Sequence, residues 1–491
     1  MRISKPTVLL ALVFIVALLP RVFDLGAFIS PDEPRWLENT QGFWEGLKTS
    51  NLSSLYQQAH PGITTMWLAA PVIDSESWAT RRLPAAIFLS GLIALATWIM
   101  IRLWGFGVGF GTGLLLAINP IFISHSRVLA MDALLSIFIL LALLFLLLWQ
   151  KERTRYWIVL SGVCAALAVL SKIIGIVVVA FTPLVLAWEQ FRHRRFDWKP
   201  WAYWLGALVL TTVIVLPTIV TDFDVVWEGT RQFFATEHYS QQVHALGPWW
   251  YPQAFLLWTT PLQLLGLAAV FFALWRDKNS RQALGILSVF AILFFLAIQY
   301  SIKKGDRYML PDLVIFDVLA VLGLVTAYTS LHLRSIKRVL LGVVLIAFGW
   351  QVWNLLELHP HYLAYRNPFF RSVAEGRTMG WGEGLDLAAE YLNKKPNAKD
   401  MLVISYYENS FAQHFVGQFT SAERLAKETP EEIGGNYVVL YRTMQGRAPD
   451  RWETKVLQQF ADKLPEHVIT LNGEEYVWIY PVVRERQGLP R

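Results

Sequence analysis

The stretch Phe28-Ile29-Ser30-Pro31-Asp32-Glu33-Pro34-Arg35-Trp36 places two adjacent carboxylates between prolines, directly after the first apolar run of the chain. Each proline lacks a backbone donor and biases the preceding residue toward extended geometry, so the stretch should not continue a helix from that run. We therefore expect Asp32 and Glu33 to lie on an irregular segment at a membrane surface. Acidic residues at such a place are often simply solvated; the alternative is that they mark an active site.

The composition is typical of a membrane protein with many spans. Of the 491 residues, 55% are hydrophobic and only 16% are charged, which is too apolar for an ordinary soluble enzyme. The net charge of +6 arises from short basic clusters between apolar runs. This is the pattern of cytoplasmic membrane loops and argues against nucleic-acid binding. Because Cys164 is the single cysteine, disulfides and cysteine-metal sites within the chain are excluded.

Apolar runs long enough to cross a bilayer follow one another along most of the chain. The first, from Thr7 to Leu19, indicates a retained span rather than a cleaved signal peptide, because Pro20-Arg21-Val22-Phe23-Asp24 offers no clear small-residue cleavage site. With it we expect about eleven transmembrane helices. The others are expected near residues 79–103, 107–125, 129–150, 156–171, 173–190, 200–220, 252–275, 282–301, 309–330 and 338–356. Residues 26–78 form a first outer loop, with short interfacial helices expected at 36–47 and 63–70.

The basic clusters also predict an orientation in the cell (inner or plasma) membrane. With a cytoplasmic N-terminus, loop after loop rich in Lys and Arg falls on the cytoplasmic side. The Asp32 segment, the loop 221–250 and everything after about His359 then lie outside the cytoplasm. The short outer loop Ser301–Tyr308 breaks the charge rule with Lys303, Lys304 and Arg307. An exception in so short a loop calls for a reason.

After the last span the composition becomes that of a soluble domain. We expect a transmembrane domain at 1–358 and a small extracytoplasmic α/β domain at 359–491. The predicted strands are 401–407, 437–441, 467–471 and 475–480, and the predicted helices are 384–393, 421–427 and 450–463. His359, His361 and Tyr362 at the junction are expected to dock this domain on the membrane part.

Several polar side chains should share the outer face with the Asp32 segment. Those are His60, Arg127, Asp132 and the cluster from Lys303 to Tyr308. Charges at membrane depth are costly and tend to line cavities or pathways, although Arg127 and Asp132 could equally form a structural ion pair. A carboxylate that accepts a proton, combined with cations that stabilise phosphate oxygens, suits transfer from a phosphate leaving group. Without a nucleoside-binding signature, a donor held by a lipid phosphate fits better than a soluble nucleotide sugar.

The order of these motifs carries a family resemblance. The motifs are Pro31-Asp32-Glu33, His60-Pro61, Arg81-Arg82-Leu83-Pro84, His125-Ser126-Arg127 with Asp132, Leu170-Ser171-Lys172, Arg307-Tyr308-Met309-Leu310-Pro311, His359 to Pro368 and Trp381-Gly382-Glu383-Gly384. In this order they resemble the GT-C glycosyltransferases of the protein O-mannosyltransferase and lipid A aminoarabinose transferase type. The resemblance extends over most of the membrane part and the start of the tail.

The resemblance implies an inverting glycosyltransferase that moves a sugar from a polyprenyl-phosphate carrier to an acceptor hydroxyl on the extracytoplasmic side. Asp32 would be the general base, and Glu33 would orient the loop or raise the basicity of Asp32. Arg127 would contact the lipid phosphate or support the first loop, and Asp132 would hold that region in place.

For the donor, the resemblance implies that Arg307 and Tyr308, with Lys303 or Lys304, face the phosphate and lipid. His60 stands where the aminoarabinose transferases have a Lys beside a Glu, so this chain departs from their pattern. The departure argues against a zinc site like that of those enzymes, and phosphate contact by His60 requires its protonated form. No cofactor is required by this interpretation, and a divalent metal stays open.

A transporter or flippase of a lipid-linked glycan is the alternative, since it could also use outer cations for phosphate. Such proteins place ionisable residues near the bilayer midplane along a two-sided path, often with internal repeats. Here the polar groups gather at one face and no repeat is evident. The pattern therefore favours the transferase, with a hexosyl or pentosyl donor and a protein, a lipid glycan or a polysaccharide as acceptor.

Overall fold

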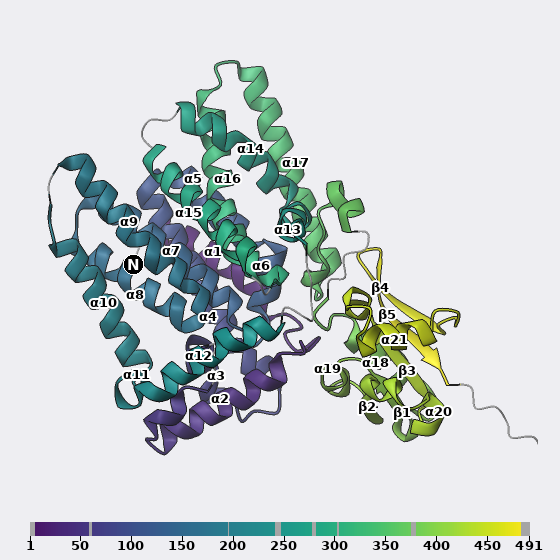
Figure 1. The fold of residues 1–491 in the computed structure, drawn as a ribbon. Coiled ribbons are helices and arrows are strands. Elements are labelled where there is room, and N and C mark those ends of the chain that lie inside the picture. Colours follow the sequence, from purple (N-terminus) through teal and green to yellow (C-terminus); the bar gives the residue numbers. More distant parts are fainter. Residues whose placement is uncertain are drawn as a thin grey trace, which may run out of the picture.

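In the computed structural model, which describes residues 5–57, 61–194, 196–240, 247–276, 281–301, 304–374 and 380–482, a large helical part is followed by a smaller domain built on a sheet (Figure 1). Within these residues, six helices are long and apolar enough to cross a membrane. They are α4 (Trp78–Trp104), α7 (Asp132–Glu152), α9 (Ile176–His193) with the turn before it, α15 (Arg281–Tyr300), α16 (Leu310–Ser330) with the turn before it, and α17 (Arg334–Leu358). They confirm a helical membrane protein with many spans.

Other apolar helices occupy the remaining expected positions. Two bent pairs raise the number of spans to eight if each pair is one span. The pairs are α5 (Phe106–Ala117) with α6 (Pro120–Ser126), and α13 (Trp250–Trp258) with α14 (Pro261–Arg276). Shorter apolar helices are α1 (Lys5–Val22), α8 (Arg155–Ser171) and α10 (Lys199–Val215). The number of full-length spans is thus lower than the eleven expected, because three of the predicted spans are short helices.

The helix α7 forms the centre of the helical part. Every residue from Asp132 to Trp149 is buried, as expected for a helix that is apolar on all sides. It packs against α4, α8 and α16. Because α7 begins at Asp132, its N-terminal end lies close in sequence to the polar residues His125, Ser126 and Arg127.

Two of the spans are broken at prolines, and a side chain near each break donates a hydrogen bond to the same carboxylate. The helices α5 and α6 meet at an angle of 60°, and α13 and α14 at 110°. Asn119 lies at the first break and donates to Oδ2 of Asp317 at 3.0 Å. Gln263 lies just after the second break and donates to Oδ1 of Asp317 at 2.7 Å. A single residue of α16 therefore accepts hydrogen bonds from the N-cap of α6 and from the first turn of α14.

The first loop contains the two helices expected there, α2 (Glu33–Lys48) and α3 (Ile63–Ala69). The expected irregular conformation at Glu33 was wrong, because Glu33 is the first residue of α2 and Asp32 is its N-cap. Pro34 is in the first turn, where its missing N–H would have had no helical partner anyway. Further along, α11 (Thr218–Thr221) and α12 (Phe223–Ser240) follow α10.

The C-terminal domain has a five-stranded sheet in the order β2-β1-β3-β5-β4. Its strands are β1 (Leu402–Ser405), β2 (Gln418–Ser421), β3 (Tyr437–Tyr441), β4 (His467–Leu471) and β5 (Glu474–Pro481). Its helices are α18 (Leu385–Asn393), α19 (Glu408–Ala412), α20 (Pro430–Ile433) and α21 (Trp452–Gln459). The strand β1 is parallel to β2 and β3, whereas β5 is antiparallel to β3 and β4. Four strands lie where they were predicted, but β2 was missed and 421–427 contains a 3-10 turn instead of a helix.

Polar contacts attach the C-terminal domain to the helical part. His361 lies 2.9 Å from the carboxylate of Asp386 at the start of α18. Trp78, the first residue of α4, donates to Gln413 at 3.3 Å. Figure 1 shows α19 of the C-terminal domain on the side of the helical part where α2 and α3 lie. The first loop and the C-terminal domain are therefore neighbours.

Candidate active site

Asp32 and Arg307 form an ion pair at the surface of the helical part. Oδ2 of Asp32 lies 2.7 Å from Nη1 of Arg307, and the two side chains are 42% and 28% exposed. Arg307 belongs to the 3-10 turn Asp306–Met309 just before α16. The structure thus brings together the expected base and one cation of the outer loop, although 275 positions separate them in the sequence.

Glu33, the neighbour of Asp32, points into the protein. Its carboxylate accepts hydrogen bonds from Nε and Nη2 of Arg82 at 2.8 and 2.7 Å. It also accepts bonds from the backbone N–H groups of Ser30 at 2.8 Å and Leu129 at 2.6 Å. Glu33 is therefore fully occupied in joining the first loop to α4 and to the segment before α7, and the structure does not place it with Asp32 and Arg307.

Arg127 and Asp132 do not pair with each other. Arg127 donates to the carbonyl oxygens of Pro20, Phe23 and Asp24 at 2.5 to 2.7 Å, which places a cation at the C-terminal end of α1, where the helix dipole favours it. Asp132 instead accepts a hydrogen bond from Lys172 at 2.6 Å. Arg127 therefore supports the chain just before the Asp32 loop, whereas Asp132 is paired with Lys172.

The remaining predicted residues form two smaller groups. The ammonium group of Lys172 lies 4.1 Å from the centre of the buried Tyr308 ring. Lys304 donates to the carbonyl of Gln299 at 2.5 Å and lies 5.3 Å from the ring centre of Tyr251. Burial lowers the pKa of Lys304 below its ordinary value. His60 and Lys303 lie outside the described residues.

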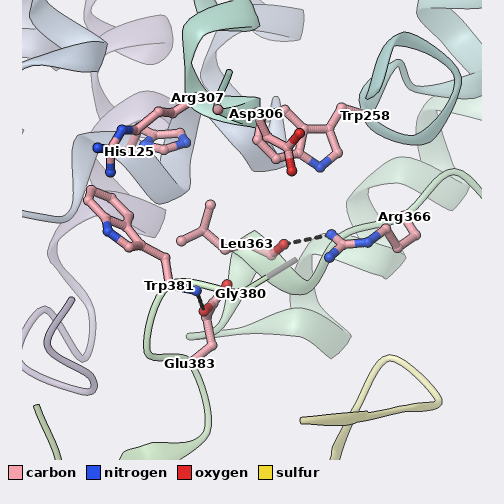
Figure 2. Close-up of a pocket in the computed structure, with 10 residues that line it drawn as sticks. His125, Trp258, Asp306, Arg307, Leu363, Arg366, Gly380, Trp381 and Glu383 are labelled. Carbon is pink, nitrogen blue, oxygen red and sulfur yellow. Dashed lines mark hydrogen bonds between the residues drawn. The ribbon is translucent and has the colours of Figure 1, made fainter. Parts of the chain in front are cut away.

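A cavity of about 160 Å³ lies beside Arg307, between the helical part and the C-terminal domain (Figure 2). The helical part contributes His125 from α6, Trp258 from the end of α13, and Asp306 with Arg307. Figure 2 shows the Arg307 guanidinium close to the Trp381 ring; its central carbon lies 4.9 Å from the ring centre. The two short helices α6 and α13 thus each supply one aromatic side chain to the cavity.

The chain after α17 contributes the other wall of the cavity, through Arg366, Gly380, Trp381 and Glu383. Glu383 accepts a hydrogen bond from the Tyr441 hydroxyl at 2.8 Å. Burial, and then the charge of Glu383, raise the pKa of Tyr441 well above its ordinary value, so this hydroxyl stays protonated and remains a donor.

Arg366 is held beside the cavity as a buried cation. It donates to the backbone carbonyl of Leu363 at 2.9 Å and to the hydroxyl of Tyr476 at 3.2 Å. Burial acts to lower the pKa of Arg366, but Tyr476 and Glu474 outweigh it and raise the pKa above its ordinary value. Arg366 therefore keeps its positive charge at the cavity wall.

The sequence did not lead us to assign Trp258 to the site, nor the residues that the chain after α17 contributes to the cavity wall. A signal was present in Trp381-Gly382-Glu383-Gly384, because such closely spaced glycines permit unusual turns. Gly382 has a φ of +99°, and a Cβ there would lie 2.8 Å from the carbonyl oxygen of Ile29. Only glycine allows this turn to touch the loop that carries Asp32.

A metal was left open by the sequence. Among the described residues, no group of three or more His, Cys, Asp and Glu side chains lies close enough together to hold a metal ion. Among the described residues, the site consists of a partly exposed ion pair, buried polar side chains and indole rings.

Comparisons with known proteins agree with this architecture. Residues 63–220 match the family model described as dolichyl-phosphate-mannose-protein mannosyltransferase. The structure is similar to that of ArnT from Cupriavidus metallidurans in the apo state, with a TM-score of 0.54 and 17% identity over 96% of this chain and 97% of that one. It is also similar to the same protein bound to undecaprenyl phosphate, with a TM-score of 0.53 and 18% identity over the same shares of the two chains.

No curated protein matches the sequence significantly. At this level of identity, the similarity in structure establishes the fold. The helical part and the C-terminal domain correspond over almost the whole length of both chains. The chain is therefore a multi-pass membrane protein with the GT-C fold, similar in structure to ArnT over almost its whole length and to the protein mannosyltransferase family model over residues 63–220.

Proposed function

We propose that the protein is a membrane glycosyltransferase that moves a sugar from a polyprenyl-phosphate carrier to an acceptor hydroxyl. One observation carries this proposal: the Asp32 carboxylate is half-exposed and lies 2.7 Å from Arg307, which lines a cavity between the helical part and the C-terminal domain. A base beside a cation suits a reaction in which a hydroxyl loses a proton and a phosphate gains charge. The ArnT structure with undecaprenyl phosphate supports a lipid carrier as the donor.

In this mechanism Asp32 is the general base. Its Oδ2 is bonded to Arg307, while Oδ1 has no hydrogen bond to a described residue and is available to an acceptor hydroxyl. As the proton passes to Asp32, the acceptor oxygen forms a bond to the anomeric carbon of the sugar. The bond from that carbon to the phosphate oxygen breaks on the opposite face, which inverts the configuration. The electron pair remains on the phosphate, and Arg307 stabilises the charge that develops there.

The other predicted residues have supporting roles in this proposal. Glu33 fixes the Asp32 loop through Arg82, and Arg127 fixes the same loop from the end of α1. Asp132 holds Lys172 beneath the Tyr308 ring, close to Arg307. Tyr308, Lys304 and Lys303 are proposed to lie on the side of the donor lipid and its phosphate.

We also propose that the protein resides in the cell membrane with Asp32 and the C-terminal domain outside the cytoplasm. The support is the positive charge of the loops between spans. Cysteines introduced at Leu464 and Leu333, which are 90% and 62% exposed, report the two sides, and the single native Cys164 is buried. An impermeant maleimide should label Leu464→Cys in intact cells and Leu333→Cys only after permeabilisation. The reverse result would overturn the orientation.

The activity is tested by incubating the purified protein with a panel of polyprenyl-phosphate sugars and an extract that contains acceptors. We expect consumption of one donor, and the glycan that it forms should be missing from a deletion strain. Transport of an intact lipid-linked glycan across a liposome, without cleavage of the donor, would instead show a flippase. Asp32→Asn provides the inactive enzyme, and Asp74→Asn is its matched control, because Asp74 is another exposed, ion-paired aspartate of the same loop.

A further inference from the structure

A groove of about 900 Å³ lies between the neighbouring helices α9 and α15 (Figure 1). At one end of the groove, Arg192 of α9 donates a hydrogen bond to Gln282 of α15 at 2.5 Å. About three turns of α9 away, the rings of Phe181 and Phe290 join the same two helices, with their centres 5.2 Å apart. The volume is at the upper end of the roughly 300–1,000 Å³ of ligand pockets, so the groove can hold a large molecule.

Away from its polar end, the groove is lined by apolar side chains, several of which face out of the protein. The exposed aliphatic ones are Leu184, Val289 and Leu293. Gly285 leaves a gap in the wall, because a Cβ there would meet no atom within 4 Å outside the backbone of its own helix. Trp188, one turn before Arg192, is 57% exposed, and an exposed Trp near the end of a span is typical of the membrane interface. The groove therefore leads from the interface into the hydrocarbon, where an acyl chain is the available occupant.

The polar end of the groove has a positive charge. Among the described residues of the lining are two arginines, Arg192 and Arg281, and no acidic side chain. Arg192 is held by Gln282, which in turn donates to the buried carboxylate of Glu189 at 3.0 Å. Arg281 donates to two backbone carbonyls in the last turn of α14, both at 2.8 Å. Both arginines remain exposed, so two cations in fixed positions face the occupant of this end.

The phosphate of the proposed donor cannot account for these two arginines. Arg281 is the first residue of α15, whereas Arg307 comes after the last residue of that helix. The 20 residues of α15 span about 30 Å, which is the thickness of the hydrocarbon core of a bilayer. A carrier whose phosphate lies at Arg307 therefore has its phosphate on the opposite side of the membrane from Arg192 and Arg281.

We infer that the groove binds an anionic phospholipid, with an acyl chain between α9 and α15 and the phosphate at Arg192 and Arg281. In the orientation proposed above, this lipid comes from the cytoplasmic leaflet, where basic pockets between membrane helices bind anionic headgroups. A guanidinium group can donate to two phosphate oxygens at once. The bound lipid contacts both helices along the groove and thus stabilises the folded protein.

The test measures the thermal unfolding temperature of the full-length purified protein in detergent with increasing amounts of one added lipid. The lipids are dioleoylphosphatidylglycerol, which is anionic, and dioleoylphosphatidylcholine, which has the same chains and no net charge. A ligand of the folded state raises the unfolding temperature, and phosphatidylglycerol should do so at lower concentration. Since each basic residue near an anionic headgroup contributes about fivefold to affinity, Arg192→Gln and Arg281→Gln should each raise the required concentration by that factor.

Two matched controls separate the headgroup from the chain. Arg155→Gln should leave the preference for phosphatidylglycerol unchanged, because Arg155 is an exposed arginine that lines a different cavity at the same end of α9. Gly285→Leu should weaken the effect of both lipids, since the new side chain occupies the place of the acyl chain. Gly342→Leu, at an equally open glycine of α17, should weaken neither.

The inference is wrong if the two lipids stabilise the wild type equally, or if the two arginine variants keep the full preference. Loss of polyprenyl phosphate binding in Arg192→Gln, with unchanged phosphatidylglycerol binding, would assign the groove to the carrier instead. Because the measurement uses neither donor nor acceptor, its result is independent of the proposed glycosyltransferase activity.

Discussion

Asp32 and Glu33 are adjacent in the chain, yet their side chains have opposite surroundings. Glu33 and Arg82 form a pair with side chains 0% and 2% exposed, and further backbone groups complete the hydrogen bonds of both residues. Asp32 and Arg307 form a partly exposed pair, and Arg307 also lines a cavity. The buried pair joins three segments of the protein, whereas the exposed pair is accessible to a substrate.

The difference shows that two adjacent carboxylates of one short loop are suited to different roles, one to stability and the other to chemistry. A buried carboxylate with all its hydrogen bonds made is unavailable for proton transfer, but removal of its partner leaves an uncompensated charge. An exposed ion pair contributes little to stability, so its residues are free to serve another purpose. Substitutions in the Asp32–Arg307 pair should therefore change the activity, whereas substitutions in the Glu33–Arg82 pair should change the stability.

The largest effect is expected for Asp32→Asn. Since general-base catalysis typically contributes about 10²–10⁴-fold, turnover of the lipid-linked donor should fall by that factor while membrane insertion stays normal. The measurement is donor consumption by equal amounts of purified wild-type and variant protein. Wild-type turnover by Asp32→Asn would assign the base elsewhere.

Glu33→Ala should act on stability instead. It leaves Arg82 as a buried, unpaired cation, which costs about 3–5 kcal/mol. The thermal unfolding temperature of the detergent-purified protein should drop strongly, or the variant should fail to accumulate. Glu38→Ala is the control, because Glu38 is an exposed glutamate of the same helix α2. Equal unfolding temperatures for the two variants would show that the buried pair is dispensable.

Arg307→Ala should chiefly weaken donor binding. The loss of a hydrogen bond to a charged group, about 1.5–3 kcal/mol, corresponds to a donor KM raised by roughly ten- to a hundredfold. The KM for the acceptor should change much less. Steady-state kinetics with each substrate varied in turn separates the two effects, and equal losses for donor and acceptor would indicate a structural role for Arg307.

The smallest effect concerns the stability of Asp32→Asn. Because exposed ion pairs are worth about 0–1 kcal/mol, this variant should unfold at nearly the wild-type temperature although it is inactive. The thermal unfolding temperature is measured in the same way as for Glu33→Ala. A destabilisation as large as that of Glu33→Ala would remove the distinction between the two pairs.

Most of the helical part could be predicted because hydrophobic runs are a local property. Pro120 and Pro261 even mark the two breaks. The hydrogen bonds that both breaks make to Asp317 could not be predicted, because Asp317 is remote from both in the sequence. The strand β2 was missed because it has only four residues, none of them buried, and therefore shows no clear alternation.

For the site, Asp32 and Arg307 could be singled out because each is a charge in an unusual place. Their contact could not be predicted, since the two residues come from opposite ends of the helical part of the sequence. The buried role of Glu33 depends on Arg82, which in the sequence looks like one of two ordinary arginines at the start of a span. His125, Trp258 and Glu383 meet only through the bends and the docked domain.

The Glu33 contacts have a consequence for the order of assembly during synthesis. Arg82 lies 49 positions after Glu33, and Leu129 lies 96 positions after Glu33. Glu33 is therefore synthesised well before either of these hydrogen-bond partners. Until the span α4 is inserted and the chain before α7 is made, the Asp32 loop lacks the groups that hold it. The loop must therefore take its final shape late, after the membrane helices around it are in place.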